Sequence, residues 1–432
     1  MKLRNVLLLL FIFSAGSMAA QTDTFDLSSY KARFERRPAM SLAGQANFHG
    51  NYGMDQTAEN AADMSGAFYW QELRNTDALI STWWLSGGLQ GAFGQSGGSN
   101  NDSYNAGGMS VNSQWEQSHY YRPGRFRGFG GTLQSIGSLS SLNNNSQNLS
   151  IKLAPAVFMG RGRIEFAEDA LLASWMIEDL EEAGVTGGHS SEDIAALART
   201  ITDIIGNRTF DFRRRRIYEL ERLQSTLRER GLAEEESFAL FAILNDNWAF
   251  ANRSSLPHGN RLTYGLEADA YSRWAHFNDF SSTQFYNYGL GFVEYTRARI
   301  INNNGGGQWA ARLAGGYYYS LRKVNEENWQ RGRDGVLAQA RLSYTRLWLP
   351  SSRTTISWVN VASVTLGLTE ALNPLSFTEN EARWISLLNM DYFINYQWSF
   401  RLRASANFVY RGTPDQLGFV PNLNFSTNYY IF

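Results

Sequence analysis

The chain has 432 residues, a formal net charge of −1 and no cysteine, and aromatic residues make up 14% of it. Because disulfides are excluded, a large core or burial in a membrane must stabilise the fold. Beyond the N-terminus no stretch approaches 18 consecutive apolar residues, which excludes a membrane protein built from spanning helices.

The first twenty residues are typical of an export signal. Lys2 and Arg4 precede a short apolar run, and small residues then lead to Ala19 and Ala20. The apolar run is shorter than the ~20 residues that a spanning helix requires. We therefore expect residues 1–20 to be a signal peptide that is cleaved after Ala19 or Ala20.

Residues 21–39 are expected to form a periplasmic N-terminal segment, after which apolar and polar residues begin to alternate. A period of two is typical of a strand with one polar and one apolar face. Six strands are predicted before residue 165, and the second has the weakest pattern. They span roughly 40–53, 63–73, 79–94, 108–121, 126–140 and 148–164.

Residues 165–254 have a different period and are expected to form an α-helical insertion of three or four helices. Ile194, Leu197 and Ile201 recur at helical spacing, and Ser190 or Ser191 precedes them as a cap. The predicted helices cover about 166–182, 190–205, 209–230 and 233–249.

Alternation returns after residue 255 and is more regular there. Near the C-terminus, for example, Leu402, Ala404 and Phe408 oppose Arg401 and Arg403. Eight further strands are predicted, over roughly 260–276, 284–300, 308–322, 335–349, 353–368, 382–397, 400–411 and 418–432.

The lengths of the breaks between strands predict a topology. Transmembrane β-barrels have an even number of strands, short periplasmic turns and longer outer loops. Fourteen strands satisfy this rule, and twelve or sixteen stay open as alternatives. With both termini in the periplasm, the long breaks fall outside. The predicted domains are then a first barrel part (40–164), the insertion (165–254) on the periplasmic side or in the lumen, and a second barrel part (255–432).

These features together resemble the Gram-negative outer-membrane β-barrel (porin-like) superfamily. The resemblance implies an all-β transmembrane antiparallel barrel in the outer membrane. It also implies recognition by the barrel-assembly machinery through a C-terminal strand ending in Phe432. Here the apolar set near the terminus shifts to Leu423, Phe425 and Tyr429, which departs from the family pattern. The insertion resembles inserts in barrel proteins of this kind and implies no activity.

Charge is separated along the chain. Residues 165–254 hold 18 acidic and 10 basic residues, so the remaining strands carry the excess of base. Charges at the lipid midplane cost ~2–4 kcal/mol each, so charged strand residues are expected to line the lumen. The predicted lumen-lining set is Arg261, Glu267, Asp269, Arg273, Arg297, Arg299, Arg312, Arg322, Arg341, Arg383, Asp391, Arg401 and Arg403.

Two interpretations of this basic wall stay open. In one, the arginines attract anions into a pore, because a low-dielectric channel focuses the field of its charges. In the other, they pair with acids across the lumen and brace it. A further hypothesis links the two parts of the chain: the acidic insertion plugs or gates the basic lumen.

No catalytic motif is found, so the chain is not expected to be an enzyme. None of the five histidines lies in a nucleophile motif or at metal-ligand spacing, and only His49 is expected to face the lumen. No cofactor and no metal are expected. The run Arg213–Arg216 is interpreted as an internal pairing surface and not as a nucleic-acid site.

The favoured function is an outer-membrane channel that passes small polar or anionic solutes, in contact with outer-membrane lipid. The alternative is a non-conducting scaffold or export subunit whose periplasmic helices bind a protein partner. A barrel enzyme that acts on lipid is the third hypothesis. The pattern leaves the oligomeric state and the solute open.

Overall fold

The computed structural model describes the chain from residue 25 to residue 429, with gaps. The described ranges are 25–51, 59–96, 102–141, 146–207, 212–233, 237–249, 255–278, 280–302, 304–325, 327–369, 380–394, 398–411 and 417–429. The predicted signal peptide and Phe432 lie outside these ranges.

Within these described ranges, one antiparallel sheet holds fourteen strands, each paired with its neighbours in sequence. This confirms the predicted fold class and strand number. The strands are β1 (Phe34–Asn51), β2 (Glu59–Asn75), β3 (Leu79–Ser96), β4 (Asp102–Arg122), β5 (Arg125–Ser140), β6 (Ser146–Phe166), β7 (Pro257–Phe277), β8 (Phe280–Asn302), β9 (Gly305–Val324), β10 (Gln330–Ser351), β11 (Thr354–Thr369), β12 (Asn380–Phe393), β13 (Trp398–Arg411) and β14 (Leu417–Tyr429).

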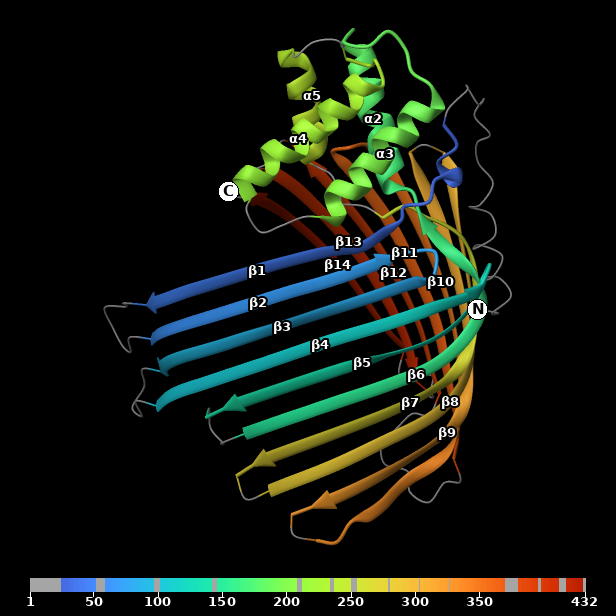
Figure 1. Cartoon of the computed structure of the whole chain (residues 1–432). Coiled ribbons are helices and arrows are strands. Elements are labelled where there is room, and N and C mark those ends of the chain that lie inside the picture. The colour runs from blue at the N-terminus through green and yellow to red at the C-terminus, as the bar shows by residue number, and fades with distance from the viewer. Residues whose placement is uncertain are drawn as a thin grey trace.

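The sheet curves around on itself, so that β10–β14 lie behind the first strands in Figure 1. The ladder pairs run from β1 to β14 in order, and the described residues include no pairing of β1 with β14. Consecutive pairing of this kind is the meander from which up-and-down barrels are built.

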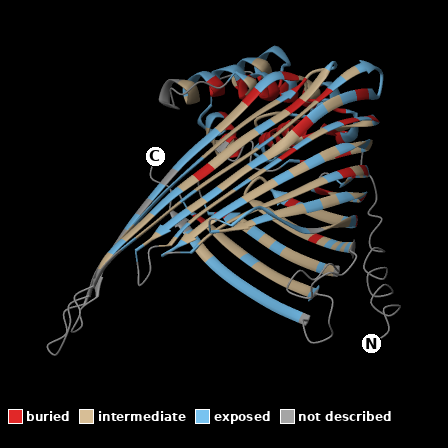
Figure 2. Ribbon diagram, turned by 90° about the horizontal axis from the view of Figure 1, so that it is seen from below, coloured by how far each residue is buried: buried red, intermediate tan, exposed pale blue. Residues whose placement is uncertain are grey.

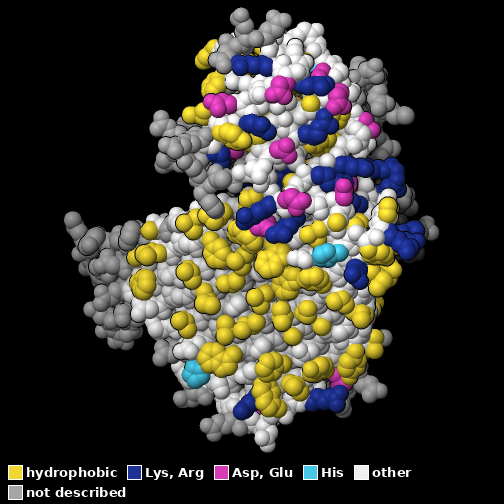
Figure 3. Space-filling view, viewed as in Figure 1, with side chains coloured by type: hydrophobic (Ala, Val, Ile, Leu, Met, Phe, Trp, Pro, Cys, Tyr) yellow, Lys and Arg dark blue, Asp and Glu magenta, His cyan; other side chains and the backbone are white. Residues whose placement is uncertain are grey.

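The two faces of the sheet differ as the alternation predicts. On β7, Tyr264 and Leu266 are exposed, while Glu267 and Asp269 point to the other face and are half-buried. Figure 3 shows that apolar side chains cover the convex outer face of the strands. The polar set therefore lies on the concave inner face, which is the arrangement of a barrel in lipid.

Two boundaries differ from the prediction. β1 begins at Phe34, inside the segment expected to be periplasmic and irregular, because residues 34–37 pair with the end of β2. β2 is seventeen residues long despite its weak pattern. Pairing with β1 on one side and β3 on the other satisfies the backbone hydrogen bonds of β2. This pairing extends the strand beyond what its side-chain pattern predicts.

Four helices follow β6, close to the predicted ranges. They are α2 (Glu168–Glu182), α3 (Ser191–Gly206), α4 (Phe212–Glu229) and α5 (Phe238–Ala249), and a short 3-10 turn, η2 (Leu27–Ser29), precedes β1. The Ser190 side chain accepts from the backbone N–H of Asp193, whose carboxylate accepts from the Ser190 N–H, so α3 starts with a capping box. None of the helices that the structure describes is long and apolar enough to cross a membrane.

We call residues 168–249 the helical cap. It lies over one end of the sheet (Figure 1), the end that holds the short turns at 123–124 and 352–353. We call this the cap end, and the opposite end the loop end. Buried side chains concentrate in the helices and in the strand ends beside them (Figure 2).

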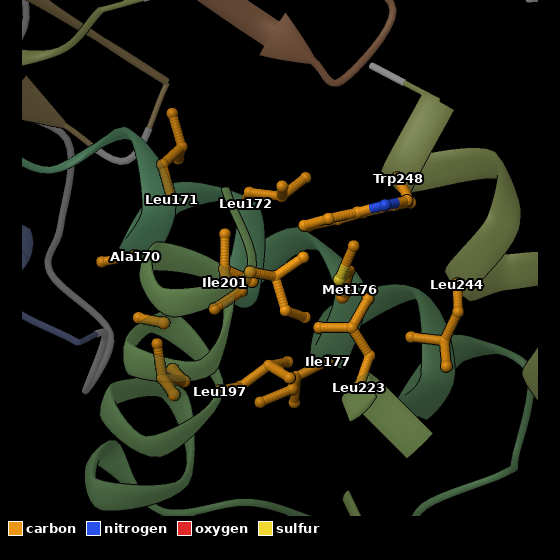
Figure 4. Close-up of a cluster of buried hydrophobic side chains, with 14 of the residues drawn as sticks. Ala170, Leu171, Leu172, Met176, Ile177, Leu197, Ile201, Leu223, Leu244 and Trp248 are labelled. Carbon is orange, nitrogen blue, oxygen red and sulfur yellow. The ribbon is translucent and has the colours of Figure 1, made fainter. Parts of the chain in front are cut away.

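The main apolar core belongs to the cap and to the rim of the sheet together. Met176 and Trp248 point toward each other in the helices (Figure 4). The same buried cluster includes Leu27 and Phe34 from the N-terminal segment and Leu349 from β10. The cap is therefore packed onto the sheet through apolar contacts, as expected for a helical unit too small to bury a sufficient core alone.

Candidate functional site

The inner face carries most of the predicted lumen-lining residues. Strand register places directly opposed residues on the same face, so the position of each charge follows from its partners. Eight of the ten predicted arginines and all three predicted acids lie on the inner face of β7–β13, and they are Arg261, Glu267, Asp269, Arg273, Arg312, Arg322, Arg341, Arg383, Asp391, Arg401 and Arg403.

The prediction is wrong for Arg297 and Arg299. On β8 both share the face of Val293 and Tyr295, which is the outer face, and both are exposed. The alternation within β8 already carried this signal, because odd-numbered positions from Val293 onward are the outward-facing ones. A strand can carry arginine on its outer face once it has passed the level of the hydrocarbon.

The sequence analysis also missed acids on the inner face, among them Glu116, Glu294 and Glu381. Glu294 lies opposite Thr263 and Arg312, and Glu381 lies opposite Thr365. Glu116 on β4 lies on the inner face of the first part of the sheet. The inner face is therefore less one-sidedly basic than ten arginines against three acids suggests.

A cavity of about 510 Å³ opens on the inner face of β4–β9. Charged residues from five strands meet there, and uncharged polar, small and aromatic residues lie between them. Its charged lining residues are Glu116, Lys152, Arg261, Glu267, Glu294 and Arg312.

Arg261 is held on both sides of this cavity. Its Nη2 lies 2.6 Å from Glu116 Oε1 and donates to Ser118 Oγ at 3.0 Å. The guanidinium also lies over the ring of Phe126, 4.6 Å from its centroid. A cation held over an aromatic face beside a carboxylate is fixed in place, so Arg261 acts as a brace between β4 and β7.

The other cations of the cavity are paired as well. Arg312 Nη2 lies 2.7 Å from Glu267 Oε2, and its Nη1 lies 3.8 Å from Glu294 Oε2. Lys152 Nζ lies 2.7 Å from Asp269 Oδ2. On this wall the bracing interpretation of the charges holds.

The wall formed by β10–β13 is different. Arg341, Arg383 and Arg403 are exposed on the inner face, and the described residues give none of them an acidic partner. Arg383 Nε donates to Asn407 and Arg403 Nε to Asn389, which orients both guanidiniums without neutralising them. Arg401 on the same wall has an ion pair, with Asp391 at 2.6 Å.

Strand register also aligns these arginines. Arg312 on β9 lies directly opposite Arg341 on β10, and Arg341 lies opposite Ser363 on β11, which lies opposite Arg383 on β12. The three guanidiniums thus form one row across the inner face. Nearer the loop end, Arg273 and Arg322 lie on either side of Gln284 and are exposed.

The helical cap is attached to the rim by ion pairs at two separated places. On one side, Arg37 Nη2 of β1 lies 2.5 Å from Asp169 Oδ2 and its Nη1 lies 3.3 Å from Glu168 Oε1. On the other, Arg353 Nη2, in the turn between β10 and β11, lies 2.5 Å from Asp246 Oδ2 of α5. The cap therefore spans the end of the sheet from β1 to β10.

Burial affects one of these groups strongly. Glu168 is largely removed from water beside the negative charge of Asp169, and these two effects raise the pKa of its carboxyl to about 7. The Arg37 guanidinium opposes the shift, and the backbone N–H of Leu256 donates to the same side chain. The contact between cap and rim thus contains a carboxyl that titrates near neutral pH.

No protein-family model matches the chain, and no curated protein matches its sequence. The solved structures that it matches include the translocator domain of the autotransporter NalP from Neisseria meningitidis, at 8% identity over 92% of this chain and 88% of that one, with a TM-score of 0.27. A TodX deltaS2S3 mutant monoaromatic hydrocarbon channel matches at 7% identity over 93% of both chains, with a TM-score of 0.27. At these identities and TM-scores the similarity gives no indication of what this chain does.

The class that the fold itself defines is a barrel-type antiparallel sheet with an apolar outer face, a charged inner face and a helical cap over one end.

Proposed function

We propose that the protein is an outer-membrane channel for small polar or anionic solutes and that the helical cap covers its periplasmic mouth. The proposal rests on three observations: the uncharged band on the outer face, the charge of the inner face and the position of the cap.

The outer face supports insertion into a membrane. In the described strands its charged side chains lie only near the cap end and the loop end, and the band between them is uncharged. Trp309 and Tyr319 bound this band on β9, ten residues apart. At about 3.4 Å per residue and a tilt of about 40°, this separation corresponds to a band about 26 Å tall, which matches the ~25 Å of an outer-membrane barrel.

The observation that carries the anion preference is the group of exposed arginines on β10–β13. Arg341, Arg383 and Arg403 have no acidic partner among the described residues, whereas the cations of the opposite wall are paired. Unpaired positive charge on one wall of a narrow polar passage attracts anions and repels cations. The ion pairs on the opposite wall hold its strands in position.

Reversal potentials of the full chain in planar bilayers test this proposal. With a gradient of potassium chloride across the bilayer, the wild type is expected to prefer chloride. Replacing Arg341, Arg383 and Arg403 together by Gln is expected to move the reversal potential toward or past zero. The matched control replaces three exposed outer-face arginines, Arg125, Arg127 and Arg161, by Gln and is expected to keep the wild-type selectivity. A triple inner-face variant with unchanged selectivity contradicts the proposal.

A scaffold that binds a periplasmic protein is the second candidate function. It is favoured by apolar side chains that the cap leaves exposed, with Phe238 86% and Ile217 57% exposed on α5 and α4. A chain that stays silent in bilayers, with and without its cap, favours the scaffold over the channel.

We propose no catalytic role. His258 Nε2 lies 3.1 Å from the backbone oxygen of Tyr30, His189 pairs with Glu181, and His276 stacks on Trp274. The side chain of His49, which was predicted to face the lumen, lies outside the described residues. Arg216 of the arginine run donates to Asn245 inside the cap, in accord with an internal pairing surface.

A further inference from the structure

The two arginines that the sequence analysis misplaced lie beside a recess on the outer face. Arg299 on β8 is directly opposite Gly307 on β9, and Gly307 is directly opposite Arg346 on β10. Neighbouring strands lie about 4.8 Å apart, so the backbones of β8 and β10 are about 10 Å apart here. The side chains of Arg299 and Arg346 project from the same face of the sheet, with only Gly307 between them.

Gly307 leaves room between the two arginines. A methyl group built on it would meet no atom closer than Ile301 Cδ1 at 3.5 Å, followed by Thr345 O and Tyr344 Cε2 at 3.8 Å. The recess is thus bounded by an aliphatic and an aromatic side chain and is open toward the surroundings of the sheet. A larger residue at this position would fill it.

Aromatic side chains lie beside the recess, and one of them contacts an arginine of the site. The Arg346 guanidinium lies 5.2 Å from the ring centroid of Trp348. Trp309, which lies opposite Arg297, has its ring centroid 4.3 Å from that of Tyr344. Tryptophan and tyrosine gather where a membrane meets water, so the recess lies at the level of the lipid headgroups if the outer face is in lipid.

Charge complementarity at this level favours an anion. Arg297, Arg299 and Arg346 lie close together on the outer face of β8 and β10. On the described outer face of β8–β10 the acidic residue is Asp334, which is at the opposite, loop end. Guanidinium groups bind phosphate through paired hydrogen bonds, and two of them on either side of a recess match a single phosphate.

A separate apolar groove lies on the outer face nearer the middle of the band. It has a volume of about 710 Å³, a floor of small residues such as Gly315 and Ala340, and walls that include Leu266 and Leu313. Leu313 is six residues from Gly307 on β9, which is about 20 Å along the strand and about 15 Å in depth after a tilt of about 40°. That depth is half of a ~30 Å hydrocarbon core, so an acyl chain attached to a phosphate at Gly307 would end in this groove.

We infer that Arg299, Gly307 and Arg346 form a binding site for the phosphate of a membrane phospholipid, whose acyl chain lies along the outer face toward the groove. The inference rests on the membrane placement in the proposed function and is independent of whether the barrel conducts. Arg297 adds charge at the edge of the site.

Native mass spectrometry of the full chain, released from detergent micelles, tests the site. The probes are phosphatidylglycerol, a diacylglycerol with the same acyl chains, and inorganic phosphate. We expect the wild type to retain phosphatidylglycerol and not diacylglycerol. The double variant Arg299→Gln/Arg346→Gln is expected to retain phosphatidylglycerol roughly tenfold less, since it loses charged hydrogen bonds.

Two further variants make the result specific. Lys323→Gln/Arg331→Gln removes the same charge from the loop end of the β9–β10 hairpin and is expected to retain phosphatidylglycerol like the wild type. Gly307→Leu keeps both arginines and fills the recess, and it is expected to lose the lipid as the double variant does. Recovery of folded protein is checked from the resistance of each variant to proteolysis, and the two independent designs keep the test decisive if one of them does not fold.

Three outcomes overturn the inference. The first is equal retention of phosphatidylglycerol and diacylglycerol by the wild type. The second is an equal loss of phosphatidylglycerol from the site variants and the loop-end control. The third is displacement of the lipid by inorganic phosphate, which would make this a site for the free ion. A chain that is silent in bilayers and retains phosphatidylglycerol selectively would refute the channel and leave the lipid site standing.

Discussion

Arg37 of β1 and Asp169 of α2 form an ion pair at 2.5 Å in which both side chains are at most 3% exposed. The same Asp169 oxygen accepts from Thr202 of α3, whose hydroxyl is 2.7 Å from that of Tyr30. The first strand, two helices and the N-terminal segment therefore meet at one carboxylate. Because water cannot reach this carboxylate, its bonds to Arg37 and Thr202 must stabilise its charge, and they hold the cap on the rim.

Replacing Arg37 by Ala is expected to destabilise the contact between cap and rim by about 3–5 kcal/mol, because it leaves a buried carboxylate without its cation. Denaturant unfolding followed by far-ultraviolet circular dichroism measures the loss. Arg36 is the neighbouring control, since its side chain is 59% exposed and pairs with Glu72 on the outer face. Arg36→Ala is expected to cost less than 1 kcal/mol. Equal losses in the two variants contradict the role of the buried pair.

The raised pKa of Glu168 predicts a pH dependence. A carboxyl whose pKa rises from 4.5 to about 7 on folding binds its proton more tightly in the folded state. The folded state therefore loses stability as the pH rises through this interval, and the loss is complete above it. Glu168→Gln, which mimics the protonated form, is expected to be increasingly more stable than the wild type between about pH 5 and pH 7.

Thermal unfolding of the helices at a series of pH values measures this difference. Glu182→Gln, at the exposed end of the same helix, is the control and is expected to follow the wild-type pH profile. A difference in unfolding temperature between Glu168→Gln and the wild type that stays constant across the pH range would show that burial does not raise the pKa of this carboxyl.

The cap can be removed at a defined place. The backbone N–H of Ala167 donates to the carbonyl of Leu256 at 3.0 Å, so the two ends of the insertion are already paired as in a hairpin. Replacing residues 168–255 by Asn-Gly, a favoured two-residue turn, joins β6 to β7 directly. Single-channel recordings are expected to show a larger conductance for this variant than for the wild type.

A milder variant controls for damage to the sheet. Asp246→Asn breaks the ion pair with Arg353 and keeps every residue of the cap. It is expected to increase the frequency of open events without changing the largest conductance. If neither variant alters the recordings, the cap does not obstruct the passage.

Close packing on the inner face predicts a glycine requirement at one position. A Cβ on Gly265 would lie 2.2 Å from the carbonyl oxygen of Val157 and 2.8 Å from Phe158 Cβ, whereas one on Gly289 would meet nothing within 4 Å. Gly265→Ala is expected to destabilise the sheet by about 1–3 kcal/mol through overpacking. Gly289→Ala is expected to have a much smaller effect, and comparing the unfolding of both variants in detergent measures the contrast.

The strands and helices were predictable because their periods are local. Alternation of two identifies β7 and β13 from side chains alone, and the stripe through Ile194 and Leu197 identifies α3. The start of β1 at Phe34 was not predictable, because its strand conformation comes from pairing with residues 73–75 of β2 and from packing under the helices.

The candidate site was predictable only in part. Local alternation placed Arg341 and Arg383 correctly on the inner face, and the same rule, followed through Val293 and Tyr295, would have placed Arg297 outside. The pairing of Arg261 with Glu116 could not be predicted from local pattern, since it joins β7 to β4 across the curvature of the sheet. Which arginines stay unpaired depends on such distant contacts, and local pattern contains no information about them.

The composition of the apolar core has a consequence for the order of assembly. Phe34, Met176 and Leu349 belong to one buried cluster although they lie far apart in the chain. The helices can bury their apolar faces only after β1 and β10 have been brought to the same rim. Protease resistance of the helices would therefore appear only after these strands have met, and so serve as a built-in report that the strands of the chain are in place.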